Sequence, residues 1–358
     1  MTRGRKRQVA VLIPAYNEET VIESTLRSIK RQVNKRDIYL VNDGSKDRTK
    51  DLAKRQIHNV LTTKNGGKAR ALNTGVSHFK LKDKYRYILL MDADTVPDKD
   101  YFKYALRHLD EDKDKKLQGV VGKVCSLGKS VYGKYRVWEY EVAHAIHKRA
   151  QANIKSIIVL PGCATVYRAQ VLGQNKIPEG TVTEDMDYTF WLHRNNLANF
   201  KFEDRAKVWT QDPQELRVLV GQVKRWYKGF WQAVEKHDVP WGGKWLDFEV
   251  SILAVEGLFN GVICLLGFVL VPLALMFDPM VLRVPLAVDL VLFFIPTLVW
   301  ASIKARKWGL IINLPYFYLL RVISSLLFLE SFFTALMSPL IKRQVWQTKR
   351  YQTGEVIN

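Results

Sequence analysis

Three long apolar segments in the last third of the chain constrain its fold more than any other feature. They cover about residues 250–277, 284–303 and 314–340. A helix needs about 20 apolar residues to cross the hydrocarbon core of a bilayer, and each segment is long enough. Buried helices of a soluble protein are the alternative, but the number, length and low charge of the segments favour membrane spans. We therefore expect a transmembrane region that follows a water-exposed part.

Four charged residues interrupt these apolar segments, and charge inside a membrane is usually paired or functional. They are Glu256, Asp289, Arg321 and Glu330. Arg321 and Glu330 are nine residues apart, which places them on opposite faces of one straight helix. We therefore expect them to face different neighbours rather than each other.

The net charge of +20 over 358 residues predicts a polyanionic neighbour, which is nucleic acid, an anionic membrane face or a phosphorylated substrate. The sequence has no zinc-ligand spacing and no aromatic-basic RNA signature, so nucleic acid is disfavoured. The three cysteines, Cys125, Cys163 and Cys264, are far apart and odd in number. This pattern argues against a disulfide framework and favours a reducing compartment, the cytoplasm, for the water-exposed part.

Strand and helix patterns alternate along the first part of the chain. The strand patterns lie near residues 8–14, 37–41, 57–62 and 86–91, and the helical patterns at 19–31, 48–55 and 67–80. Such alternation predicts an α/β fold with a parallel, helix-covered sheet. Ligands of these sheets bind outside the carboxyl ends of the strands. Here those ends carry polar residues at 14–18, 42–45 and 92–94.

Asp92 and Asp94 follow the strand pattern at 86–91 and, being one residue apart, point to the same side. Mg²⁺ and Mn²⁺ prefer carboxylate oxygens together with substrate phosphates, so this pair suits a metal shared with a nucleotide diphosphate. A solvated acidic turn before a helix near Asp98 is the alternative.

A second candidate motif opens the helical pattern at 67–80. It consists of two glycines followed by a lysine: Gly66, Gly67 and Lys68. Such a helix start lets backbone amides and an ammonium approach a phosphate or a base. The motif lacks the spacing of a Walker site.

The ordered segments 13–18, 41–45, 67–73 and 92–94 resemble the inverting family 2 glycosyltransferases, which have the GT-A fold, a Rossmann-like mixed sheet. The family usually has Asp-Asp-Gly in the second segment, where this chain has Asn42 before the second aspartate. The resemblance implies a nucleotide-sugar donor, a divalent metal (Mg²⁺ or Mn²⁺) and roles for five acidic or basic residues. It puts Glu18 and Asp43 near the base and ribose, lets Lys68 help hold the nucleotide, and makes Asp92 and Asp94 the ligands of the nucleotide and its metal.

Thr183-Glu184-Asp185 matches the T-E-D motif of the processive members, where the aspartate is the catalytic base. Thr183 is expected to cap a helix that runs to about Asn195. Acidic residues in a first helical turn often only complement the helix dipole. The resemblance instead makes Asp185 the base that deprotonates the acceptor hydroxyl, with Glu184 and Asp187 as neighbours that raise its pKa.

Gln222-Val-Lys-Arg225-Trp226 lies in a helical pattern from about 213 to 235, where Gln222, Arg225 and Trp226 share one face. It matches the Q-x-x-R-W of processive β-glycosyltransferases such as cellulose, chitin, hyaluronan and poly-N-acetylglucosamine synthases. An arginine can grip a departing diphosphate, and an indole can stack on a sugar. An amphipathic helix at the membrane interface is the alternative, and both interpretations can hold together.

The resemblance and the hydropathy together predict four parts: a GT-A catalytic domain at 1–211, an interfacial helix at 212–248, transmembrane helices at 249–341 and a basic tail at 342–358. The expected function is inverting transfer from UDP-N-acetylglucosamine or UDP-glucose onto a growing β-linked glycan, carried out processively. The alternatives are a non-processive transferase with a lipid-phosphate acceptor, and a channel or scaffold with a decayed enzyme domain. The expected location is the cytoplasmic membrane, with several spans and the catalytic domain in the cytoplasm.

The side of the membrane on which the tail lies is open. Three spans place it outside, whereas its lysines and arginines favour the inside. The segment Trp346-Gln-Thr-Lys-Arg350 looks like the W-x-x-T-x-R ending that some of these synthases carry, which also favours the inside. One segment would then be interfacial or re-entrant. The family's usual membrane helices ahead of the catalytic domain are not found, so the expected partners include a second copy or an accessory membrane subunit besides the lipid bilayer.

Overall fold

The structure is a computed structural model that describes residues 6–278 and 280–337. The chain forms two compact units. Of the described residues, the first unit holds 6–125 and 148–211, and the second holds 126–147 and those between 212 and 337. The segment 126–147, which the sequence groups with the catalytic part, therefore belongs with the membrane-type helices. The predicted tail at 342–358 lies outside the described residues.

The first unit contains an eight-stranded sheet in the order β3-β2-β1-β4-β7-β6-β8-β5. Its strands are β1 (Arg7–Ala15), β2 (Ile38–Asn42), β3 (Asn59–Thr62), β4 (Tyr85–Leu90), β5 (Val96–Pro97), β6 (Gly119–Ser126), β7 (Thr165–Arg168) and β8 (Phe200–Thr210). β1 pairs in parallel with β2 and β4, and β2 with β3, while β7 is antiparallel to both β4 and β6. The predicted mixed sheet is confirmed.

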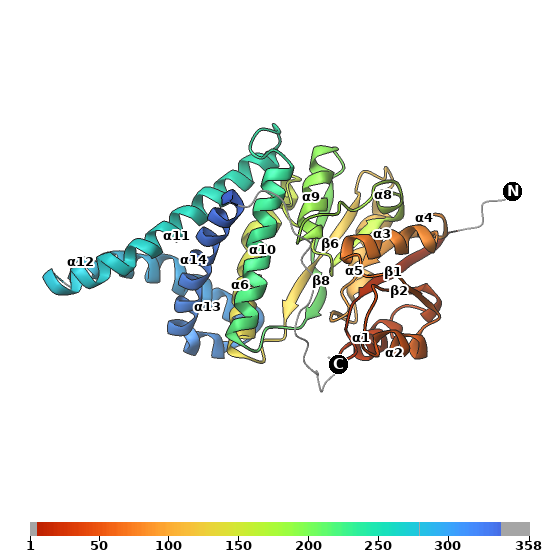
Figure 1. Cartoon of the computed structure of the whole chain (residues 1–358), viewed down its shortest axis with the longest axis horizontal. Coiled ribbons are helices and arrows are strands. Elements are labelled where there is room, and N and C mark those ends of the chain that lie inside the picture. Colours follow the sequence, from red (N-terminus) through yellow and green to blue (C-terminus); the bar gives the residue numbers. More distant parts are fainter. Residues whose placement is uncertain (1–5, 279, 338–358) are drawn as a thin grey trace. The chain divides into compact units, whose positions relative to one another are not determined.

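Helices cover both faces of this sheet. They are α1 (Ile22–Lys30), α2 (Thr49–Gln56), α3 (Lys68–His78), α4 (Leu81–Lys84), α5 (Tyr101–Glu111), α7 (Arg149–Asn153), α8 (Ala169–Gln174) and α9 (Glu184–Arg194), with a short 3₁₀ turn η1 (Lys35–Asp37). Figure 1 shows α1 and α2 on one side of β1 and β2, and α3 and α4 on the other. The strand order explains this arrangement, because right-handed crossovers place helices on opposite faces when the chain reverses direction across the sheet, as it does between β3 and β4.

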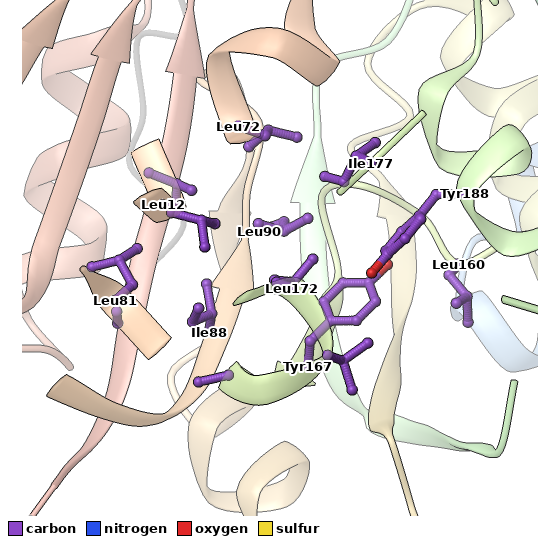
Figure 2. Packing of buried hydrophobic residues seen from close by; sticks show 14 of the residues in the cluster. Leu12, Leu72, Leu81, Ile88, Leu90, Leu160, Tyr167, Leu172, Ile177 and Tyr188 are labelled. Atoms are coloured by element: carbon purple, nitrogen blue, oxygen red, sulfur yellow. The ribbon is translucent and has the colours of Figure 1, made fainter. Parts of the chain in front are cut away.

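The core of the first unit lies against β1 and β4, whose central residues are apolar and buried. Figure 2 shows Leu12 and Leu90 of these strands packed together with Leu72 of α3. α3 approaches the sheet closely at Gly75, where a Cβ would lie 2.7 Å from Leu12 Cδ1 and 2.8 Å from Val41 Cγ2. The glycine at this position therefore lets α3 lie close to the strands. Lys68 stands at the start of this helix.

The second unit is helical. Its elements are α6 (Val131–Val142), the π-helical η2 (Ala143–Lys148) that leads back into the first unit, α10 (Leu216–Lys236), α11 (Trp245–Phe277), α12 (Met280–Val288), the π-helical η3 (Asp289–Phe294), α13 (Ile295–Ala305), the 3₁₀ helix η4 (Trp308–Asn313) and α14 (Leu314–Met337). Within the described part of the chain, three stretches are long and apolar enough to cross a membrane: Trp245–Phe277, Arg283–Ala305 and Trp308–Met337. These agree with the three apolar segments seen in the sequence.

Arg321 and Glu330 have separate partners, as their spacing predicts. Arg321 of α14 binds Asp289 of η3 through both carboxylate oxygens, at 2.8 and 3.0 Å. Glu330 instead forms an ion pair with Lys224 of α10, with 2.7 Å between Lys224 Nζ and Glu330 Oε1. α10 is fixed to α14 by further polar bonds, among them Tyr227 to Ser324 at 2.6 Å. The α10 helix that carries the Gln-x-x-Arg-Trp motif is therefore packed on a candidate membrane span.

Gly75→Val tests the close packing of α3 on the sheet. The added atoms meet the buried side chains of Leu12 and Val41, and overpacking of this kind typically costs about 1–3 kcal/mol. We expect the midpoint of thermal unfolding of the purified full chain in detergent to fall by several degrees. Ser77→Val is the matched control, because Ser77 is an exposed residue of the same helix. Equal midpoints for the two variants would contradict the packing described.

Candidate active site

The carboxyl ends of β1, β2 and β4 meet at one edge of the sheet. The parallel registers pair Ala15 with Asn42 and Leu12 with Leu90, so the residues that follow the three strands emerge side by side. Glu18, Asp43 and Asp92 follow these strand ends. The acidic side chains that the sequence selected are thus gathered along one edge of the first unit, where open α/β sheets bind ligands.

Asp43 holds the loop that leads into α3. Its two carboxylate oxygens accept the backbone N–H groups of Gly66, at 2.9 Å, and Gly67, at 2.8 Å. Its neighbour Gly44 has φ +75°, and a Cβ there would lie 2.8 Å from the backbone nitrogen of Asn65. The Asp-Gly pair therefore lets β2 and the loop approach closely, and it fixes the start of α3.

Glu18 is also buried at this edge, just after β1. Its backbone N–H donates to Thr49 Oγ1 at 2.7 Å, which ties the end of β1 to the start of α2. Glu18 and Asp43 are each about 3% exposed. The contact of these two residues with a base and ribose stays a prediction.

Lys68 occupies the centre of the site. Its ammonium lies 2.7 Å from Asp92 Oδ1 and 2.7 Å from Glu184 Oε1, and its side chain is 11% exposed. Burial alone would lower the pKa of Lys68, but the nearby carboxylates of Asp92 and Glu184 raise it well above its usual value. Lys68 is therefore a firmly charged cation that joins the end of β4 to the start of α9.

Glu184 and Asp185 differ in their surroundings although they are adjacent at the start of α9. Burial, with the charges of Asp185 and Asp92, raises the pKa of Glu184, while Lys68 acts in the opposite direction. The Asp185 carboxylate accepts backbone N–H groups from Met186 at 2.9 Å and from Gly162 at 3.4 Å. Glu184 is thus engaged by a lysine, and Asp185 by backbone groups.

Two other residues, Thr183 and Asp187, lie at the start of α9. Thr183 is the residue before the helix, as predicted, but its side chain makes no capping hydrogen bond. Asp187 is completely buried and accepts a hydrogen bond from Thr181 Oγ1 at 2.9 Å. Asp187 therefore supports the loop that precedes the helix.

Asp92 and Asp94 are the two carboxylates that the sequence predicts for a divalent cation. The Asp92 side chain is 24% exposed, so it can reach a ligand from the solvent side. No group of three or more His, Cys, Asp and Glu side chains suited to a metal occurs among residues 6–278 and 280–337. Two carboxylates fit a cation such as Mg²⁺, which takes its other oxygens from water and substrate phosphate instead of from a protein cage.

Cys163 lies beside this site and could be mistaken for a nucleophile. Burial and the negative charge of Asp92 raise the pKa of the Cys163 thiol well above its usual value. A thiol that stays protonated is a poor nucleophile. This agrees with a packing or acceptor-contact role and with a reaction that needs no covalent intermediate.

Gln222, Arg225 and Trp226 lie on α10 in the second unit, where a residue of α6 contacts two of them. Arg136 Nη2 donates to Gln222 Oε1 at 3.0 Å, and the Arg136 guanidinium lies 4.4 Å from the centre of the Trp226 ring. Arg136 is itself only 3% exposed and pairs with Glu139 at 2.5 Å. One face of the Trp226 ring is therefore covered by a buried cation.

The sequence did not predict the role of Arg136. Its signal was one of two charges, Lys134 and Arg136, in the aromatic pattern Tyr132–Trp138, with Glu139 three residues after Arg136. Tertiary packing brings Arg136 to Gln222 and Trp226.

Comparison with known proteins agrees with this architecture. The model of a family described as glycosyltransferase like family 2 matches residues 6–229, which include the motifs from residue 13 to Trp226. The chain belongs to glycosyltransferase family 2. The resemblance inferred from the ordered motifs is therefore confirmed.

Relatives of this family 2 glycosyltransferase include poly-β-1,6-N-acetyl-D-glucosamine synthases. The synthase of Staphylococcus aureus (strain COL) is 30% identical over 229 residues, which are 62% of this chain and 54% of that protein. The synthase of Staphylococcus epidermidis is 29% identical over 243 residues, 63% of this chain and 57% of that protein. The chain thus spans little more than half the length of these relatives.

The structure is also similar to that of the mannosyltransferase PcManGT from Pyrobaculum calidifontis, solved in complex with GDP-Man and Mn²⁺. The TM-score is 0.56 at 17% sequence identity, with 88% of each chain covered. At this identity the similarity shows the fold. The GT-A-like fold expected for this family 2 glycosyltransferase is confirmed.

Lys68→Met removes the cation from between Asp92 and Glu184. Loss of one partner of a buried ion pair typically costs on the order of 3–5 kcal/mol. Without Lys68 the pKa of Glu184 in the folded state rises further above its unfolded value, so the protonated carboxyl is tolerated at low pH. The folding stability of Lys68→Met is then lost as the pH rises through the pKa that Glu184 has in the folded state. We expect the fall in the unfolding midpoint, relative to wild type, to be larger at pH 8 than at pH 5.

The control is the double variant Lys68→Met/Glu184→Gln, in which the unpaired carboxylate is also removed. It should recover part of the midpoint at pH 8. A loss of the same size at both pH values, with no recovery in the double variant, would show that Lys68 contributes packing and not charge.

Proposed function

We propose that this protein transfers a sugar, with inversion, from a nucleotide-sugar donor onto a growing β-linked glycan at a membrane. The observation that carries the proposal is the Lys68 ammonium, which lies 2.7 Å from both Asp92 and Glu184. It joins the Asp-x-Asp pair, where a donor diphosphate would bind, to the Thr-Glu-Asp segment, where an acceptor would be deprotonated. A donor and an acceptor can then meet over one group of charges in the first unit.

The donor side is formed by Glu18, Asp43, Lys68, Asp92 and Asp94. We propose that Asp92 and Asp94 hold Mg²⁺ or Mn²⁺, which when bound would neutralise charge on the leaving diphosphate. Lys68 supplies a further positive charge at the same place. UDP-N-acetylglucosamine is the first donor to test because the named relatives are poly-β-1,6-N-acetyl-D-glucosamine synthases. UDP-glucose is the second.

The base is Asp185. Inverting transfer needs a base for the acceptor hydroxyl on the side opposite the leaving nucleotide. Glu184 is engaged by Lys68 at 2.7 Å, so the lone pairs of that carboxylate are directed to a cation. Asp185 is oriented by the backbone N–H groups of Gly162 and Met186. Glu184 then contributes by holding Lys68, and Asp185 accepts the proton.

We infer the roles of the Gln-x-x-Arg-Trp residues of α10 from the motif that they form. We propose that Arg225 stabilises the departing diphosphate and that Trp226 stacks on the acceptor sugar. Arg136 covers one face of the Trp226 ring at 4.4 Å, so a sugar would stack on the opposite face. The hydrogen bond from Arg136 to Gln222 keeps this pair of side chains ordered without a ligand.

The three apolar stretches support a membrane-bound enzyme. We propose the cytoplasmic membrane, with the nucleotide-binding unit in the cytoplasm where nucleotide sugars are made. Within 212–248, α10 would lie at the interface, and the stretches within 249–341 would cross the bilayer. A second copy of the chain or an accessory membrane subunit would complete a path for the glycan.

The direct test is product analysis of the purified full chain in lipid vesicles with a panel of UDP and GDP sugars, with and without chelator. We expect a β-linked polymer from one UDP sugar, dependent on Mg²⁺ or Mn²⁺. Asp185→Asn keeps the shape of the base but removes its basicity, and should lower turnover on the order of 10²- to 10⁴-fold while donor binding survives. A lipid carrying a single sugar with every donor would identify the non-processive alternative.

Trp226→Ala and Arg225→Ala separate elongation from transfer. Loss of the stacking surface should abolish long polymer, while release of free UDP by donor hydrolysis continues. Loss of the guanidinium removes stabilisation of charge that develops in the transition state, so Arg225→Ala should lower UDP release whatever the acceptor length. The measurement is paired, with free UDP and chain length determined on the same samples. Wild-type chain lengths from Trp226→Ala would exclude the stacking role.

A further inference from the structure

Arg136 of α6 is a buried arginine that takes part in no step of the proposed transfer. Its side chain is 3% exposed, although an arginine is almost never fully buried unless it is paired. Its neighbours Tyr135 and Val137 are also buried, and they belong to an apolar cluster that includes Leu219 and Val223 of α10. The backbone that carries Arg136 is therefore fixed against the helix that carries the Gln-x-x-Arg-Trp motif.

Three side chains surround the Arg136 guanidinium. Its Nη1 donates to Glu139 Oε2 at 2.5 Å, and its Nη2 donates to Gln222 Oε1 at 3.0 Å. The guanidinium carbon lies 4.4 Å from the centre of the Trp226 ring, within the range of a cation–π contact. A planar guanidinium can make all three contacts, because its donors point in different directions within one plane. One side chain of α6 thus holds Gln222 and Trp226, which lie one helical turn apart on α10.

This arrangement is not the one that stability alone favours. Arg136 Nε is buried and has no hydrogen-bond partner among the residues that the structure describes. A buried donor without a partner is costly, and well-packed apolar residues often stabilise such a place better than a buried ion pair does. The Glu139 side chain is 25% exposed, so water can solvate this carboxylate if Arg136 is removed. We therefore look for the contribution of Arg136 in the two motif side chains that it holds.

The accessible part of Trp226 lies on the side that Arg136 does not cover. Trp226 is partly exposed, whereas Arg136 is buried. A sugar that stacks on the indole therefore meets a ring that already has a fixed position. The last torsion angle of an aromatic side chain has broad preferences, so an unsupported ring turns more freely. Each binding event would then have to order the ring, and this ordering weakens binding.

We propose that Arg136 is a positioning residue that determines how many sugars are added to one chain, because it holds Gln222 and Trp226 in the orientation that receives the acceptor end. The inference rests on the proposed stacking of the acceptor sugar on Trp226. In a processive enzyme the chain end moves by one sugar after each transfer and must stack again before the next. A fixed indole favours this stacking over release of the chain.

The test compares Arg136→Met, Arg136→Lys and Lys134→Met in the purified full chain in lipid vesicles. Arg136→Met keeps an unbranched apolar stem beside Trp226 but removes the charge and the hydrogen bonds. Arg136→Lys keeps the charge, but an ammonium cannot bind Gln222 and Glu139 while it lies over the ring. Lys134→Met removes a positive charge from the same helix and controls for that loss.

We expect Arg136→Met to shorten the polymer and to raise KM for an oligosaccharide acceptor by about 3- to 30-fold, the range to which a cation–π contact and a hydrogen bond correspond. Oligosaccharides cut from the wild-type product serve as the acceptors. Nucleotide release by donor hydrolysis and KM for the donor should stay within about twofold of wild type, because uniform binding of the donor is unchanged. Arg136→Lys should give chains of intermediate length, and Lys134→Met chains of wild-type length.

A second readout does not need activity. The protein is labelled with a fluorinated tryptophan, and the fluorine resonance of Trp226 is identified as the one that Trp226→Phe lacks. A ring held in one orientation beside a cation gives a single narrow resonance. We expect this resonance to move and broaden in Arg136→Met and to keep its wild-type position in Lys134→Met.

The possible results separate this inference from the proposed function. A wild-type protein that makes no polymer, or Trp226→Ala protein that makes chains of wild-type length, removes the proposed stacking and this inference together. If Trp226→Ala makes no long polymer but Arg136→Met makes chains of wild-type length, the role of Arg136 is overturned while the stacking stands. Equal losses of chain growth and nucleotide release in Arg136→Met, with an unmoved fluorine resonance, would reduce Arg136 to a packing residue.

Arg136→Lys carries the test if Arg136→Met does not fold. It retains a cation in the buried position, and the same split is expected, with shorter chains and nearly unchanged nucleotide release. Wild-type chain lengths from Arg136→Lys, together with an unmoved Trp226 resonance, would then overturn the inference.

Discussion

A buried cation between carboxylates organises the first unit. Lys68 lies 2.7 Å from Asp92 and from Glu184, which come from elements far apart in the chain. Charges taken out of water must be paired, and removing one member leaves the others at a high energetic cost. The start of α3, the end of β4 and the start of α9 must therefore come together for the fold to be stable. The same arrangement places the donor-side and acceptor-side motifs next to each other.

The sheet provides this arrangement by combining two pairing patterns. The parallel strands β3, β2, β1 and β4 bring Asp43 and Asp92 to one edge. The antiparallel strand β7 pairs with β4 and closely follows Gly162, whose backbone N–H binds Asp185, so this contact is brought to the same edge. Asp43 then fixes the two glycines before Lys68. The parallel strands alone would bring the donor-side residues together, but not the start of α9, which carries the proposed base.

Arginine and lysine have different uses in the second unit. Arg136 uses its planar guanidinium to bind Gln222 while it lies over Trp226, a combination that a lysine cannot reproduce. Arg321 uses the same geometry to bind both oxygens of Asp289 within apolar stretches. Lys224 meets Glu330 as a point charge that links α10 to α14. These contacts fix one helical element of the second unit against another.

The sequence by itself determined the alternation of strands and helices, the three apolar stretches and the separate partners of Arg321 and Glu330. These follow from local periodicity and helix geometry, which neighbouring residues decide. It also determined the family, because the motifs occur in a fixed order. Only the tertiary structure decided that Lys68 binds Glu184, that Arg136 covers Trp226 and that 126–147 joins the second unit. Such contacts join residues distant in sequence, and the energy of pairing a buried charge depends on the surrounding fold and leaves no periodic pattern to read.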